Sequence, residues 1–136
     1  MKTNNEKAIC YANERMERLR RAKEQLAEEV SQLMGHSSEE NLKWTASAID
    51  LMEALYYAFQ EQTMTDDYGV PLSFRHIVNR CCQVLHVKVP RNPYESANRG
   101  RMRKGVKCMN YLKRYMLLME TGKENVLWKG VSTALA

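Results

Sequence analysis

The first 35 residues carry apolar side chains at a spacing that predicts one long helix over residues 5–34. Apolar or small residues recur at alternating steps of three and four, so they form two rows along one helical face. As a heptad, one row holds Ile9, Met16, Lys23 and Val30, and the other holds Ala12, Leu19, Leu26 and Leu33. Gly35 follows at the place where helices commonly end.

A face this narrow is typical of a helix that packs against one other helix. The only charged residue in either row is Lys23. The flanking positions offer few attractive charge pairs for a two-chain coiled coil. Two arrangements therefore stay open: a homodimer or partner helix through residues 9–33, or packing of this helix on the rest of its own chain.

Four shorter helices are predicted after a polar linker. Ser47 and Ser73 are expected to cap the first two of them, and Asp50, three residues after Ser47, is expected to complete a capping box. Pro93 suits the first turn of the next helix. The predicted spans are about 47–63, 73–86, 93–102 and 106–121.

These elements predict an all-α fold of about five helices. We expect a long N-terminal helix over residues 1–35, a compact helix-turn-helix-like, DNA-binding-like domain over residues 41–122, and a C-terminal tail over residues 123–136. The residues from Leu42 to Thr45 alternate in polarity, which favours an extended segment. The apolar part of the tail is expected to dock beside it, which allows a minor pair of short strands.

Positive charge is concentrated between Lys88 and Arg114. This segment contains nine Lys and Arg residues and one acid, Glu95, so its net charge is +8, whereas the whole chain is +5 and the other residues sum to −3. A compact basic segment in an otherwise slightly acidic chain attracts polyanions, of which nucleic acid is the commonest. The alternative is a solvated helix face that only keeps the protein in solution.

The side chains of this segment also suit DNA, because Arg reads guanine and Asn reads adenine in the major groove. The third and fourth predicted helices are then the supporting and inserted helices of a helix-turn-helix-like module. Arg101, Arg103 and Lys104 lie off the apolar stripes, so replacing them is expected to leave the helices intact. The predicted contacts with double-stranded DNA are Lys88, Arg91, Asn92, Asn98, Arg99, Arg101, Arg103, Lys104 and Lys107.

Enzyme chemistry finds little support in the chain. No phosphate-binding glycine pattern, zinc-protease motif or nucleophile elbow is present, so we expect no enzyme, no catalytic residue and no cofactor. A zinc site that uses Cys81 or Cys82 with His86 and Cys108 is an alternative to buried free thiols, which we expect, and no metal ligand is predicted.

No apolar run approaches the roughly 20 residues that a membrane helix needs, so no membrane contact is expected. The N-terminal residues are not followed by the apolar core of a signal peptide. We therefore expect a cytoplasmic protein.

Two stretches of the sequence resemble RteC-type proteins of conjugative and mobilizable transposons in Bacteroidetes. The first is Leu42-Lys43-Trp44-Thr45 with Ser47 and residues 51–58, and the second is Tyr94 with the run from Arg101 to Lys104 ahead of a helix. A chain of this length also resembles the TnpC-type proteins of mobilizable transposons. The resemblance covers about residues 41–120 and implies a helical DNA-binding regulator that promotes excision of the element.

Two hypotheses about function follow. In the leading one, the protein is a DNA-binding accessory or regulatory protein of a mobile genetic element, acting in excision or mobilization and binding duplex DNA through the basic segment. In the alternative, it is a protein-interaction adaptor that uses the heptad-patterned first helix and does not bind nucleic acid directly.

Overall fold

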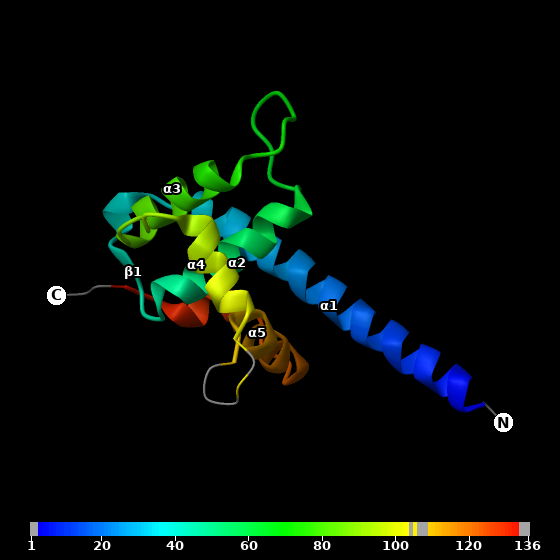
Figure 1. Cartoon of the computed structure of the whole chain (residues 1–136). Helices are drawn as coiled ribbons and strands as arrows, with labels where there is room; N and C mark the ends of the chain where they lie inside the picture. The colour runs from blue at the N-terminus through cyan, green and yellow to red at the C-terminus, as the bar shows by residue number, and fades with distance from the viewer. Residues whose placement is uncertain (1–2, 104, 106–108, 134–136) are drawn as a thin grey trace.

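Five α-helices make up most of the chain that the computed structural model describes, which is residues 3–103, 105 and 109–133 (Figure 1). They are α1 (Asn4–Met34), α2 (Ala48–Glu61), α3 (Phe74–Leu85), α4 (Pro93–Arg101) and α5 (Tyr111–Glu120). Two short 3₁₀ helices, η1 (Ser38–Glu40) and η2 (Val126–Gly130), and two strands, β1 (Leu42–Trp44) and β2 (Val131–Thr133), complete the fold. The predicted all-α fold with a minor strand pair is confirmed.

Polar caps explain where the helices begin. The hydroxyl of Ser47 accepts a hydrogen bond from the amide of Asp50, and that of Ser73 accepts one from the amide of His76, each at 3.1 Å. The predicted capping box at Ser47 is only half formed, because the carboxylate of Asp50 turns toward two arginines. The fifth helix was predicted from about residue 106, but α5 begins at Tyr111 because Asn110 caps it.

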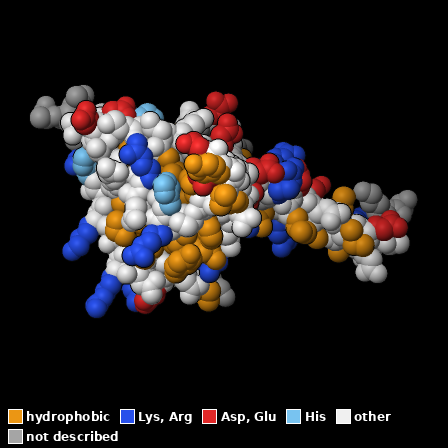
Figure 2. Space-filling model, turned by 90° about the horizontal axis from the view of Figure 1, so that it is seen from above, with side chains coloured by type: hydrophobic (Ala, Val, Ile, Leu, Met, Phe, Trp, Pro, Cys, Tyr) orange, Lys and Arg blue, Asp and Glu red, His pale blue; other side chains and the backbone are white. Residues whose placement is uncertain are grey.

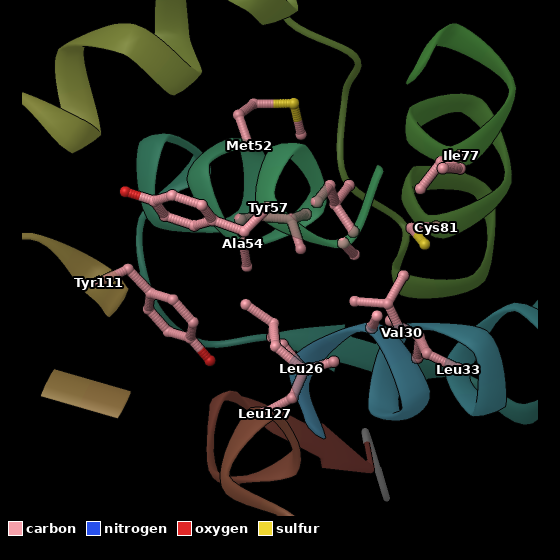
Figure 3. Close-up of a cluster of buried hydrophobic side chains, with 14 of the residues drawn as sticks. Leu26, Val30, Leu33, Met52, Ala54, Tyr57, Ile77, Cys81, Tyr111 and Leu127 are labelled. Atoms are coloured by element: carbon pink, nitrogen blue, oxygen red, sulfur yellow. The ribbon is translucent and has the colours of Figure 1, made fainter. Parts of the chain in front are cut away.

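The second half of α1 packs inside its own chain. Figure 3 shows Val30 and Leu33 pointing toward Cys81 of α3, and Leu26 lying beside Leu127 of η2. This side of α1 is therefore part of the same core as α2 and α3. The fully buried larger side chains of the core include Leu26, Val30, Leu33, Leu51, Met52, Leu55, Phe74, Ile77, Leu85 and Leu127.

The first half of α1 leaves the body of the molecule, as Figure 1 shows. Ile9 and Met16 are 61% and 69% exposed, although both belong to the predicted apolar face. From Leu19 onward that face is covered in cis, and the ammonium of Lys23 lies 5.5 Å from the ring centre of Tyr57. The heptad face is therefore divided between an internal half and an uncovered half.

The C-terminal tail pairs with the extended segment, as predicted. β1 and β2 are antiparallel, with Leu42 opposite Thr133 and Trp44 opposite Val131. The backbone at Gly130 comes so close to Trp44 that a Cβ there would lie 2.7 Å from the indole ring. Glycine is therefore required at this contact, since real Cβ atoms essentially never approach so closely.

None of the helices in the described ranges combines the length and the apolar composition needed to cross a bilayer. α1 has 31 residues, but charged side chains occur on most of its turns. The second half of α1 packs in the core, and its first half extends beyond the body of the molecule.

Candidate nucleic-acid interface

Helix α4 lies directly on α2, and this contact decides which of its side chains face outward. Ala97 and Gly100 are buried at the contact. A Cβ on Gly100 would lie 2.7 Å from Oε1 of Glu53 and 3.2 Å from Cγ2 of Ile49. The opposite side of α4 is therefore the solvent side, and its exposed residues are Tyr94, Glu95, Asn98 and Arg99.

Glu53 of α2 also positions α5. This carboxylate is fully buried and accepts hydrogen bonds from the amides of Tyr111 and Leu112, at 3.0 and 2.9 Å. Burial raises the pKa of Glu53, and the two amide donors at the start of α5 counter part of that rise. The side chain of Glu53 thus lies against α4 and also binds the first two amides of α5. Through this residue, α2 holds both helices of the basic segment in place.

The loop between α3 and α4 presents the basic residues with the fewest partners. Lys88 and Arg91 are exposed, and neither makes an ion pair or hydrogen bond with any residue that the structure describes. Asn92 differs from them, because its side-chain oxygen accepts a hydrogen bond from the amide of Glu95 at 3.2 Å and caps α4. Lys88 and Arg91 are therefore available to an external anion, while Asn92 has a structural task.

The predicted contacts on α4 interact mainly with one another and with α2. Arg99 pairs with Glu95 at 2.9 Å, and Nη2 of Arg101 donates to the side-chain oxygen of Asn98 at 3.0 Å. The guanidinium of Arg101 also lies 4.6 Å from the ring centre of Tyr56. Arg101 thus packs on the fold, although Asn98 and Arg99 stay exposed.

Arg103 is bound to the interior. It reaches Asp50 at 3.4 Å, and Arg114 of α5 reaches the same carboxylate oxygen at 2.5 Å. Asp50 is only 5% exposed, so its charge needs these partners. Arg101 and Arg103 therefore contact the fold itself, and the prediction that the helices stay intact when both are replaced stays a prediction. Lys104 and Lys107 lie outside the described residues.

Two further polar residues, missed from the sequence, join the exposed cations. Arg75 and Asn79 are exposed on α3, facing the loop before α4 across a hollow of about 270 Å³. A signal was present: residues 68–119 contain eleven Lys and Arg residues and one acid, Glu95. Figure 2 shows one face of the body, where Lys and Arg side chains lie beside hydrophobic ones, with Asp and Glu side chains along one edge. The basic face consists of Arg75, Asn79, Lys88, Arg91, Asn98 and Arg99.

No protein-family model, curated protein or solved structure matches this chain. The resemblance to RteC-type and TnpC-type proteins therefore stays a prediction from the residues quoted above.

The cysteines on α3 are core residues. Cys81 and Cys82 are buried, and burial raises the pKa of both thiols, that of Cys82 to about 11. His86, the nearest potential zinc ligand, has Nε2 2.8 Å from the carbonyl oxygen of Ser38. Within the described ranges no three His, Cys, Asp or Glu side chains converge in a way that would hold a metal ion, and Cys108 lies outside those ranges.

Proposed function

We propose that this protein binds double-stranded DNA through the basic face on α3, the α3–α4 loop and α4. The observation that carries the proposal is the exposure of Arg75, Lys88 and Arg91, none of which pairs with a described residue. Cations without internal partners neutralise phosphates most effectively, because they give up no existing ion pair. The single acid of the segment, Glu95, is already paired with Arg99.

We further propose that the protein is an accessory or regulatory protein of a mobile genetic element, acting in excision or mobilization. This part rests on the resemblance alone. The order of α3 and α4 is that of a helix-turn-helix-like pair, although their loop, residues 86–92, is longer than the usual turn and α4 packs mainly on α2. Protection of DNA at the ends or control region of the element that encodes the protein is the experiment that tests it.

Replacing Arg75, Lys88 and Arg91 together with Gln is expected to weaken binding to random duplex DNA. The slope of log affinity against log salt should become shallower by about 2–3 units, since each phosphate contact contributes about 0.9. Fluorescence anisotropy at several salt concentrations measures both quantities.

A variant with Gln at Lys7, Arg15 and Lys123 is the matched control, because it removes the same charge from exposed positions that likewise make no ion pair with a described residue. This control variant should keep most of the wild-type slope of log affinity against log salt. Equal slopes in wild type and in the α3–loop variant, with unchanged circular dichroism, would contradict the proposed interface.

The adaptor function remains a second candidate, because the first half of α1 is uncovered. Ile9 and Met16 expose most of their surface on a segment that extends away from the body (Figure 1). The protruding helix carries hydrophobic side chains together with basic and acidic ones (Figure 2). An exposed row of this kind is typical of a surface that meets another helix.

If this half of α1 pairs chains or binds a partner helix, Ile9→Lys with Met16→Lys should abolish the association. Analytical ultracentrifugation of the full chain over a wide concentration range measures self-association. Asn4→Lys with Gln32→Lys adds the same charge off the heptad rows and should leave association unchanged. A wild-type chain that stays monomeric at every concentration would exclude the homodimer and leave only a different partner.

A further inference from the structure

Apolar and polar side chains together line the hollow beside the α3–α4 loop. Its volume is about 270 Å³, and Phe74, Val78, Val89 and Pro90 contribute its apolar surface. Arg75, Asn79, Arg91 and Asn92 stand around it. Drug-sized ligands fill pockets of roughly 300–1,000 Å³, so this hollow suits a single ring system with a charged substituent.

The charge around the hollow favours an anionic substituent. Arg75 and Arg91 make no ion pair with described residues, so both guanidinium groups keep their full positive field. The first residues of α3 and α4, Phe74 and Pro93, also line the hollow. The positive ends of two helix dipoles therefore add to the field of the two guanidinium groups.

An exposed aromatic ring completes the site. Tyr94 is 55% exposed, and its ring centre lies 4.6 Å from that of Phe74, which is only 1% exposed. Tyr56 contacts the same ring edge to face, with centres 6.1 Å apart. The tyrosine ring is thus supported on its inner side and free on its outer side, which is the arrangement of a stacking platform.

We propose that this hollow receives one unpaired base of a DNA strand, stacked on Tyr94, with the adjoining phosphates held by Arg75 and Arg91. The inference rests on the proposed function, because it names what the basic face does with a nucleotide that leaves the helix. A base supplies the planar ring and the phosphate supplies the anion. The amide of Asn79, and Nδ2 of Asn92, whose oxygen caps α4, offer hydrogen bonds to the base edge.

Two labelled duplexes test this inference: one fully paired, and one with the same sequence and a single unpaired nucleotide. By fluorescence anisotropy, wild type is expected to bind the second duplex about tenfold more tightly, the size of one base–aromatic stack. Tyr94→Ala should remove that preference while binding to the paired duplex remains. Tyr94→Phe, which keeps the ring, should retain it.

Tyr68→Ala is the matched control, because Tyr68 is 93% exposed on the α2–α3 loop and does not line the hollow. It should behave as wild type. If Tyr94→Ala does not fold, a photoreactive thymine at the unpaired position of wild-type complexes decides instead, since it should crosslink to the walls of the hollow, within residues 74–79 or 89–94.

The outcomes separate the two proposals. Equal wild-type affinity for both duplexes, or a crosslink elsewhere on the chain, would overturn the inference while the duplex-binding function stands. Tyr94-dependent binding of the unpaired nucleotide without any binding to the paired duplex would overturn the duplex function alone. Displacement by a phosphotyrosine peptide but not by an oligonucleotide would assign the hollow to a protein partner and also overturn the inference.

Discussion

Glu29→Ala is expected to lower the free energy of unfolding by about 3–9 kcal/mol, because it leaves three buried donors without an acceptor at about 1–3 kcal/mol each. Glu29 is 4% exposed. Its carboxylate accepts hydrogen bonds from the hydroxyl of Tyr115 at 2.7 Å and from the amides of Val126 and Leu127 at 3.0 and 3.1 Å. Burial and the bond to Glu29 together raise the pKa of the Tyr115 hydroxyl, which stays protonated as a donor.

The loss should be largest at the C-terminal end of the chain. Glu29 joins α1 to α5 and to η2, and η2 leads directly into β2, which pairs with β1. The free energy of unfolding of a small domain is about 5–15 kcal/mol, so the expected loss is a large fraction of the total stability. Urea denaturation measures the free energy, and limited proteolysis should show earlier cleavage within residues 121–133.

Glu28→Ala is the control for this experiment, because Glu28 is the exposed neighbour on the same helix. It should change the stability little, as substitutions at exposed sites usually do. Glu29→Gln should fall between the two variants, since its amide offers one acceptor oxygen in place of two. Equal stability of the Glu28 and Glu29 alanine variants would contradict the role assigned to the buried carboxylate.

Gly100→Ala is expected to destabilise the protein by about 1–3 kcal/mol, the cost of overpacking a close contact. On an exposed helix the same change stabilises by about 1 kcal/mol, so even the sign of the effect is diagnostic. The new Cβ would meet Oε1 of Glu53 at 2.7 Å and Cβ of the same residue at 3.0 Å. Glu53 has no room to move, because both amides at the start of α5 bind its carboxylate.

This substitution should also weaken DNA binding, because it displaces α4 from α2 and with it the exposed Asn98 and Arg99. Thermal unfolding and duplex binding of the variant measure the two effects. Gly35→Ala is the matched control: its backbone is also right-handed helical, and the added Cβ would make only an ordinary 3.4 Å contact. A Gly100→Ala variant as stable as Gly35→Ala would show that α4 does not lie on Glu53 as described.

Local patterns located the helices, except that α5 begins at Tyr111 and not near residue 106. Apolar spacing predicted α1 to within one residue at its N-terminus, and the hydroxyls of Ser47 and Ser73 marked the beginnings of α2 and α3. Periodicity and caps involve residues within a few positions of one another, so the sequence displays them directly. The placement of positive charge in one half of the chain was visible in the same way.

Local patterns did not reveal which cations are free, since that depends on contacts between distant residues. Asp50 forms ion pairs with Arg103 and Arg114, which lie 53 and 64 positions later in the sequence. Arg75 and Arg91, in contrast, pair with no described residue. The heptad face of α1 shows the same limit, because its spacing marks an apolar side without naming what covers it. Packing inside the chain covers that face from Leu19 onward, and Ile9 and Met16 are left exposed because the body of the molecule does not extend that far.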